Sequence, residues 1–310
     1  MRLMGRKLRV EYPGAIYHVM NRGDRRELIF ADDEDRKLFV ATLGEACGKT
    51  GWEVQVYNLM PNHFHLVVET PRPNLVAGMK WFLGTYTSRF NRRHKLFGHL
   101  FSGRYKGLIV DGSGDGYFKT VCDYVHLNPV RAKLLVPEQR LREYRWSSWP
   151  EYLKRPGQRP EWLRVERLLG EYGIPKDSAA GRRRLEECLE ARRAAEEGMD
   201  YRAIRRGWFF GDWELKRELL EAMRGGFGEH HEGQEKWESA EAHAEAVVEE
   251  EMRQMGWEPK ELERRSKGDA GKTRIARRLR AETTMSRKWI AKRLSMGCVS
   301  MVAHCLQRKR

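Results

Sequence analysis

Hydrophobic patterns of two kinds alternate along the first 130 positions. Ala15–Arg22 is rich in strand-forming residues and follows a Pro-Gly turn, so it predicts a β-strand. Trp52–Asn58 and His63–Glu69 each alternate between hydrophobic and polar positions. Because the Pro-containing segment Leu59–Asn62 joins them directly, they predict two neighbouring antiparallel strands.

Helical patterns lie between and after these strands. Hydrophobic residues recur every three to four positions in Asp32–Lys49, Leu75–Arg92 and Gly116–Leu127, which predicts three helices. Tyr105–Val110 predicts a further strand. The resulting order β-α-β-β-α-β-α is typical of an α+β fold with a ferredoxin-like antiparallel sheet. Helices would cover one face of that sheet and leave the other face for chemistry.

Composition divides the rest of the chain. Lys154–Pro160 is rich in Pro and Gly and reads as a connector, and charged helical patterns with glycine breaks follow it. We therefore predict a catalytic domain over residues 1–152, a connector and charged helical region over 153–256, and a basic region over 257–310.

The last forty residues predict two helices joined by a tight turn. Ser286–Leu294 begins with a good capping residue, Ser295–Gly297 provides the turn, and Val299–Gln307 forms the second helix. This arrangement is typical of a helix-turn-helix, in which the second helix would present Ser300, His304 and Arg308 to a DNA groove. The alternative is a charged helical hairpin that packs on the catalytic domain.

The charge balance favours a polyanionic partner. The 310 residues include 59 Lys and Arg against 44 Asp and Glu, which gives a net charge of +15. Residues 1–150 carry +9, residues 151–256 carry −5 and residues 257–310 carry +11, so both ends are basic. Nucleic acid is the expected partner, although composition alone also fits a basic protein without a particular ligand.

Cysteine usage and hydropathy exclude several protein classes. The five cysteines form no CxxC pair, which argues against a zinc ribbon or a disulfide scaffold. No apolar run approaches the length of a membrane span, and the N-terminus does not read as a signal peptide. We expect a cytoplasmic, nucleoid-associated protein with no membrane partner.

Two histidines on one predicted strand are the first candidate for chemistry. Side chains alternate across a strand, so His63 and His65 share one face while Phe64 points to the other. Two neutral imidazoles placed in this way can reach a single divalent ion. They can equally be polar residues on a half-exposed sheet face.

A tyrosine and an asparagine are the second candidate. Tyr124 and Asn128 are four residues apart in a helical segment, so they share a helix face that offers a phenol and an amide oxygen. Tyr124 alone could be an ordinary core residue of an amphipathic helix.

Taken together, the motifs resemble a known family, the tyrosine transposases of the histidine-hydrophobe-histidine superfamily, and in particular their REP-associated branch. The resemblance covers about residues 8–150 and rests on five segments in the order of the family: YPGAIYHVMNRG (Tyr12–Gly23), LMPNHFHLVVE (Leu59–Glu69), FSGRYK (Phe101–Lys106), YVHLNPVRAKLL (Tyr124–Leu135) and YRWSSWPEY (Tyr144–Tyr152).

The resemblance implies a mechanism for this chain. His63 and His65 would bind Mg²⁺ or Mn²⁺, and Tyr124 would attack a DNA phosphodiester to give a 5′-phosphotyrosine and a free 3′-hydroxyl. Asn128 would supply a third metal ligand at the position where many single-tyrosine relatives have Gln. The expected partner is single-stranded or hairpin-forming repeat DNA, and a homodimer is compatible with the resemblance. Neither a GxxxxGK[ST] loop nor a GxGxxG turn is present, which argues against nucleotide hydrolysis.

Basic and aromatic residues beside the motifs could hold the DNA. The aromatic residues Tyr17, Tyr105 and Trp146 offer faces for stacking unpaired bases, whereas His18 is expected on the strand surface and His126 in a structural role. The basic residues expected to contact phosphates are Arg22, Arg25, Arg26, Arg104, Lys106 and Arg131.

Two other functions remain compatible with these residues. A catalytically silent, sequence-specific DNA-binding regulator could use the same fold, although it would not need a complete set of His63, His65, Tyr124 and Asn128. A metal-dependent hydrolase could use the two histidines to activate water, and it would release its products without a covalent intermediate.

Overall fold

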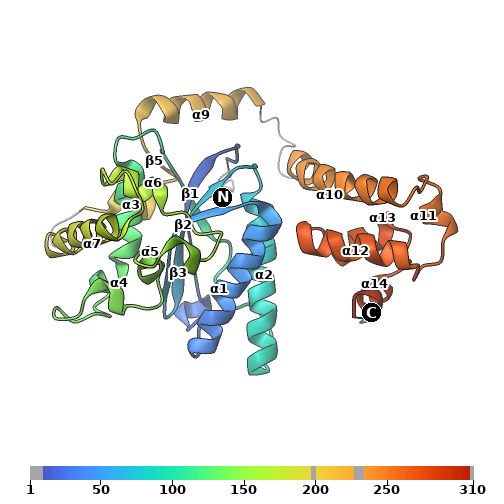
Figure 1. Ribbon diagram of the computed structural model, residues 1–310, viewed down its shortest axis with the longest axis horizontal. Helices are drawn as coiled ribbons and strands as arrows, with labels where there is room; N and C mark the ends of the chain where they lie inside the picture. The colour runs from blue at the N-terminus through green and yellow to red at the C-terminus, as the bar shows by residue number, and fades with distance from the viewer. Residues whose placement is uncertain (1–9, 197–199, 227–233, 308–310) are drawn as a thin grey trace, which may run out of the picture.

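The computed structural model of the chain describes residues 10–196, 200–226 and 234–307 (Figure 1). None of the described helices is long and apolar enough to cross a membrane. The strands are β1 (Ala15–Arg22), β2 (Glu53–Met60), β3 (His63–Thr70), β4 (Lys106–Val110) and β5 (Phe209–Phe210). The first nine α-helices are α1 (Asp33–Thr50), α2 (Leu75–His94), α3 (Tyr117–His126), α4 (Asn128–Arg131), α5 (Trp149–Tyr152), α6 (Glu166–Glu171), α7 (Ala179–Ala194), α8 (Arg202–Arg206) and α9 (Trp213–Gly226). Five further α-helices follow: α10 (Gln234–Gln254), α11 (Glu261–Arg264), α12 (Ala270–Glu282), α13 (Arg287–Arg293) and α14 (Val299–Gln307). The short 3-10 helices are Asp24–Arg26, Leu141–Glu143 and Pro156–Gln158.

The five strands form one sheet in the order β2-β3-β1-β4-β5. Neighbouring strands are antiparallel except for β4 and β5, which run parallel. The predicted α+β class and the predicted order β-α-β-β-α-β-α are confirmed. The bounds of β1 agree with the sequence prediction, and β2 extends two residues further, to Met60, before a short turn leads into β3.

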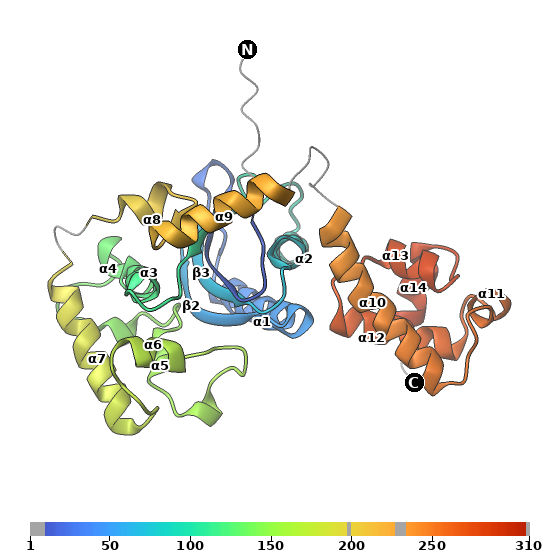
Figure 2. The ribbon, with the colours of Figure 1, turned by 90° about the horizontal axis from the view of Figure 1, so that it is seen from above.

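The pleat of β3 divides the sheet into two faces. On one face, Phe64 packs against Phe39 of α1 and Phe82 of α2, with ring centroids 5.0 and 6.3 Å apart. Helices α1 and α2 therefore cover this face as predicted (Figure 2). The opposite face was expected to be free of helices, but α3 lies on it: Asn58, opposite His65 in the β2–β3 ladder, donates a hydrogen bond to the Val125 carbonyl.

The helical segment after β4 ends within one residue of the predicted bound at Leu127, but it does not continue through Asn128 as the predicted shared face of Tyr124 and Asn128 requires. Helix α3 ends at His126, Leu127 links the helices, and α4 starts at Asn128. Pro129 explains the interruption, because its ring nitrogen has no hydrogen to donate to the helical ladder. Tyr124 and Asn128 therefore lie on two successive helices.

The described apolar residues gather in two clusters. The larger cluster runs from Ala15 in β1 to Leu219 in α9, so α6 and α7 pack with the sheet and its helices. The smaller one runs from Ala244 in α10 to Cys305 in α14. The division into residues 1–152, 153–256 and 257–310 remains a prediction.

Helices α12, α13 and α14 form a compact unit at the C-terminal end (Figure 1). Ser286 caps α13 through its hydroxyl, which accepts a hydrogen bond from the Trp289 amide at 3.2 Å. Positive φ angles at Ser295 (50°) and Gly297 (84°) reverse the chain between α13 and α14. The α1 residue Lys49 donates hydrogen bonds to the carbonyls of Arg280 and Ala281, so α12 lies against α1. Two helices joined by a turn are present as predicted, and the assignment of a DNA-binding helix-turn-helix remains a prediction.

A buried acid links α3 to the segment that follows α6. Asp123 is 3% exposed and accepts a hydrogen bond from the Tyr172 hydroxyl at 2.7 Å. Burial raises the pKa of Asp123 from 3.8 to about 6, although the hydrogen bond from Tyr172 opposes this effect. Because the pKa is higher in the folded protein, the contribution of Asp123 to stability is greatest below pH 3.8 and is lost as the pH rises through about 6.

Replacing Asp123 by Asn should therefore stabilise the protein above pH 6 and have little effect near pH 4. Two pKa units correspond to a gain of up to about 3 kcal/mol in the free energy of unfolding near pH 8. Urea unfolding of Asp123→Asn and the wild type at the two pH values measures this difference.

Asp177 provides a control of opposite sign. Burial alone would raise its pKa, but hydrogen bonds from Arg159 and Arg182 outweigh burial and lower the pKa of Asp177. Asp177→Asn should therefore destabilise the protein at neutral pH. An equal gain in the free energy of unfolding for Asp123→Asn at pH 4 and pH 8 would contradict the raised pKa of Asp123.

Candidate active site

His63 and His65 lie on the face of the sheet that α1 and α2 leave open, and each ring has its Nδ1 atom in a hydrogen bond. His63 Nδ1 is 2.8 Å from Asn62 Oδ1, and His65 Nδ1 is 2.9 Å from His18 Nε2. Within the described residues, no hydrogen bond engages Nε2 of His63 or of His65. The two ring centroids are 5.1 Å apart. Both histidines therefore keep one nitrogen available on the same face.

The surroundings keep these imidazoles uncharged at neutral pH. Burial, and then the nearby charge of Arg22, lower the pKa of His63 to about 4. Burial and neighbouring basic groups lower the pKa of His65 well below 6.5. A neutral imidazole has a lone pair, which is what coordination of a metal ion requires.

Tyr124 of α3 faces the histidines from across the open face. Its ring makes edge contacts with the rings of His18 and His65, with centroids 5.7 and 5.8 Å apart. The side chain of Asn58 in β2 donates a hydrogen bond to the carbonyl of Val125 at 3.1 Å and so ties α3 to the sheet. The structure thus brings Tyr124 together with the paired histidines.

Arg131 and Tyr201 cover Tyr124, which is 6% exposed. The Arg131 guanidinium carbon lies 4.1 Å from the centroid of the Tyr124 ring, and the guanidinium donates to the Tyr124 carbonyl. Arg131 also forms an ion pair with Glu196. The Tyr201 ring lies 5.0 Å from that of Tyr124. Arg131, expected to hold phosphates, is instead paired with a carboxylate, because the chain after α7 brings Glu196 to it.

Asn128 is the first residue of α4 and is buried. Its side chain makes no hydrogen bond to another described residue. Across the described part of the chain, no group of three or more His, Cys, Asp or Glu side chains is placed to hold one metal ion. A metal site here would therefore need the amide oxygen of Asn128 beside the two histidines.

Five of the basic residues expected to contact phosphates line one cavity of about 330 Å³, where β1 ends and the antiparallel strand β4 begins. They are Arg22, Arg25, Arg26, Arg104 and Lys106. None of the five forms an ion pair with a described carboxylate, and the buried Nδ2 of Asn21 in the same cavity has no partner there. Arg22 lies directly opposite His63 in the β1–β3 ladder, so this basic cavity adjoins the paired histidines.

A comparison with the sequence models of known families matches the part of the chain that carries these groups. Residues 11–128 match the sequence model of the family described as "Transposase IS200 like". We refer to this segment as the transposase domain because of this similarity. The resemblance inferred from the motifs is confirmed over residues 11–128 at the level of this family, whose members are described as transposases.

Two further comparisons concern solved structures and curated proteins. A solved structure described as a REP-associated tyrosine transposase bound to a REP hairpin is 13% identical to this chain, with a TM-score of 0.41. The alignment covers 52% of this chain and 92% of that one. No curated protein matches the chain.

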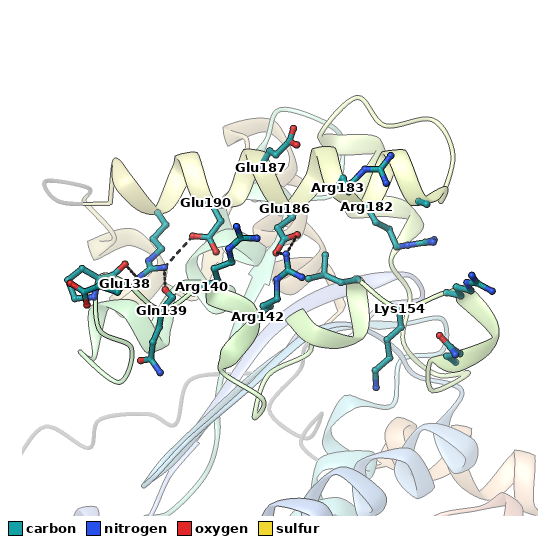
Figure 3. Close-up of a pocket in the computed structure, with 16 residues that line it drawn as sticks. Glu138, Gln139, Arg140, Arg142, Lys154, Arg182, Arg183, Glu186, Glu187 and Glu190 are labelled. Carbon is teal, nitrogen blue, oxygen red and sulfur yellow. Dashed lines mark hydrogen bonds and ion pairs between the residues drawn. The ribbon is translucent and has the colours of Figure 1, made fainter.

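A second cavity lies away from the groups predicted to act in the transposase domain. It measures about 970 Å³ and lies between α7 and the segment 137–158 (Figure 3). Several of its charges pair with one another, as Arg142 does with Glu186 and Arg193 with Glu190. None of the predicted site residues lines this cavity.

The residues expected to read DNA in the C-terminal region lie outside the transposase domain. Ser300 and His304 are exposed on α14, and Arg308 lies outside the described residues. On α13, Ile290 and Ala291 are buried.

Some residues of the transposase domain and of the segment after it are placed differently from the sequence interpretation. His18 is buried beside His65, whereas it was expected on the strand surface; the alternation of β1 puts it on the same face as Arg22. Tyr17 and Tyr105 are buried and offer no stacking face, because both pack into the core. The structural role of His126 agrees with its buried contact to Ser148 at 3.1 Å. No pattern in the sequence pointed to Glu196 or Tyr201.

Proposed function

We propose that the transposase domain is a metal-dependent nuclease and strand transferase that acts on single-stranded DNA, such as hairpin-forming repeats. The observation that carries this proposal is the contact of the Tyr124 ring with His65, which lies beside His63 on the same strand face. The Nε2 atoms of both histidines take part in no hydrogen bond among the described residues.

The proposed metal ligands are His63, His65 and Asn128. Two neutral imidazoles and an amide oxygen suit Mn²⁺, and they accept Mg²⁺ when water completes its coordination. A bound ion would offset the negative charge that builds up on the phosphate. The residues fit such an ion because each histidine has its Nδ1 atom fixed and its Nε2 atom available.

The proposed nucleophile is Tyr124. Its hydroxyl oxygen would attack the phosphorus, and the bond from phosphorus to the 3′-oxygen would break. The tyrosine gives up one proton and the 3′-oxygen takes up one, so the strand ends are a 5′-phosphotyrosine and a 3′-hydroxyl. A 3′-hydroxyl can attack this linkage in turn, which rejoins strands without nucleotide hydrolysis. Arg131, at 4.1 Å from the ring, would stabilise negative charge on the Tyr124 oxygen.

The proposed DNA path runs from the paired histidines into the basic cavity. Its unpaired guanidinium and ammonium groups suit phosphate oxygens, and the Asn21 amide would add one donor. In the C-terminal unit, we propose that α14 lies in a groove of duplex DNA with Ser300, His304 and Arg308 facing the bases. Such a division would separate cutting from site recognition.

Replacing Tyr124 by Phe should reduce cleavage of a single-stranded repeat substrate by at least about a thousandfold, because the attacking oxygen is removed. The affinity for that substrate should change less than about threefold, because most binding comes from phosphate contacts. Cleavage on denaturing gels and fluorescence anisotropy measure the two quantities.

Tyr117→Phe is the matched control, because Tyr117 also belongs to α3 but lies next to Phe210. It should cut like the wild type. Cleavage by Tyr124→Phe at the wild-type rate would favour the hydrolase alternative, and absence of cleavage by the wild type would favour the silent regulator.

Replacing Arg104 and Lys106 together by Ala should weaken binding to single-stranded DNA and flatten its dependence on salt. Each lost phosphate contact should lower the slope of log affinity against log salt by about 0.7, so the pair should lower it by about 1.4. Anisotropy titrations at several salt concentrations provide the slopes.

Arg164→Ala is the control for this pair, because Arg164 is exposed and forms an ion pair with Glu53 at 3.3 Å. Its loss removes a positive charge outside the basic cavity and should leave the slope nearly unchanged. Equal slopes for the double variant and for Arg164→Ala would mean that the basic cavity does not contact phosphates.

A further inference from the structure

His18 makes a close polar contact to the paired histidines from the neighbouring strand β1. Its Nε2 atom lies 2.9 Å from Nδ1 of His65, and the two rings are nearly parallel, with an interplanar angle of 15°. Both side chains are buried. In the β1–β3 ladder, Met20 lies opposite His65 and Val67 lies opposite His18, so the two histidines are diagonal neighbours on one face.

The proton positions in this part of the sheet follow from the hydrogen bonds. The Asn62 amide nitrogen donates to the Arg26 carbonyl at 3.1 Å, which identifies the other side-chain atom of Asn62 as the oxygen. An oxygen only accepts, so His63 Nδ1 carries the hydrogen and donates it. The Nε2 atom of His63 therefore has the lone pair.

The His18–His65 bond can run in two directions, and only one leaves His65 able to bind an ion through Nε2. If His65 donates from Nδ1, its Nε2 atom has the lone pair, as in His63. If His18 donates from Nε2 instead, the hydrogen of His65 is on Nε2 and blocks coordination there. Two histidines that share one ion through Nε2 need the first arrangement.

We propose that His18 is a positioning residue that accepts the Nδ1 hydrogen of His65 and thereby keeps the Nε2 lone pair of His65 directed at the ion shared with His63. This inference rests on the proposed metal site. His18 acts through His65 and is not itself a ligand, because its Nε2 atom is engaged with the His65 ring. Among the described residues, no group of three or more His, Cys, Asp or Glu side chains is placed to hold one ion.

The test measures binding of Mn²⁺ to the full-length protein without DNA, by electron paramagnetic resonance of the free ion. His18→Phe keeps a flat ring but removes the acceptor, and it should weaken Mn²⁺ binding about 10- to 100-fold. His18→Gln offers an amide oxygen as acceptor and should restore most of that affinity. Unchanged affinity in folded His18→Phe, or equal losses in the two variants, would overturn the positioning role.

His63→Ala separates this inference from the proposed function. If His63→Ala binds Mn²⁺ as well as the wild type does, the proposed metal site is wrong and the positioning role is overturned with it. If His63→Ala loses binding while His18→Phe keeps it, the metal site stands and only the role of His18 fails.

A measurement on the unaltered protein tests the same inference without relying on the folding of a variant. With ¹⁵N-labelled histidine, long-range ¹H–¹⁵N correlation spectra distinguish the two neutral forms of each ring. In the metal-free protein we expect the hydrogen of His65 on Nδ1. A hydrogen on Nε2 of His65 would show that His18 is the donor and would overturn the proposal.

Discussion

Strand β3 pairs with β1 on one side and with β2 on the other, so a shift of one residue would break two ladders at once. This fixed register is the constraint on which the site depends. It sends Phe64 into the core beside α1 and α2, and it sends His63 and His65 to the opposite face. Burial of one large aromatic ring thus holds the two imidazoles in place, because moving them would bring Phe64 out of the core.

The other half of the site depends on how α3 lies against that face. Asn58 is opposite His65 in the β2–β3 ladder and donates to the carbonyl of Val125, next to Tyr124. Tyr124 is then covered by Arg131 and by Tyr201, whose pKa is raised to about 12 by burial and by its hydrogen bond to Glu196. The hydroxyl of Tyr201 donates to Glu196 at 2.9 Å, so of the two neighbouring tyrosines it is Tyr124 that has a hydroxyl without such a bond among the described residues.

The sequence pattern was sufficient for the local features of this arrangement. Alternation along His63–Glu69 predicted both the strand and the shared face of the histidines, and the five basic residues near the motifs do line one cavity. Features that depend on distant segments could not be predicted. The pairing of Arg131 with Glu196 joins residues 65 positions apart, and the burial of His18 follows from the pairing of β1 with β3. The end of the helix was predicted to within one residue, at Leu127, whereas the shared helix face of Tyr124 and Asn128 was not found, because Pro129 interrupts the helical ladder.

The central claim is that Tyr124, rather than its neighbour Tyr201 or a water molecule, forms a covalent bond to DNA. The direct measurement is to incubate the full-length protein and Mn²⁺ with a single-stranded repeat substrate, isolate the protein–DNA adduct under denaturing conditions, and map it by peptide mass spectrometry. The account predicts a phosphodiester link on the peptide that contains Tyr124, with a free 3′-hydroxyl on the released strand. An adduct on Tyr201, or cleaved DNA without any adduct, would contradict it.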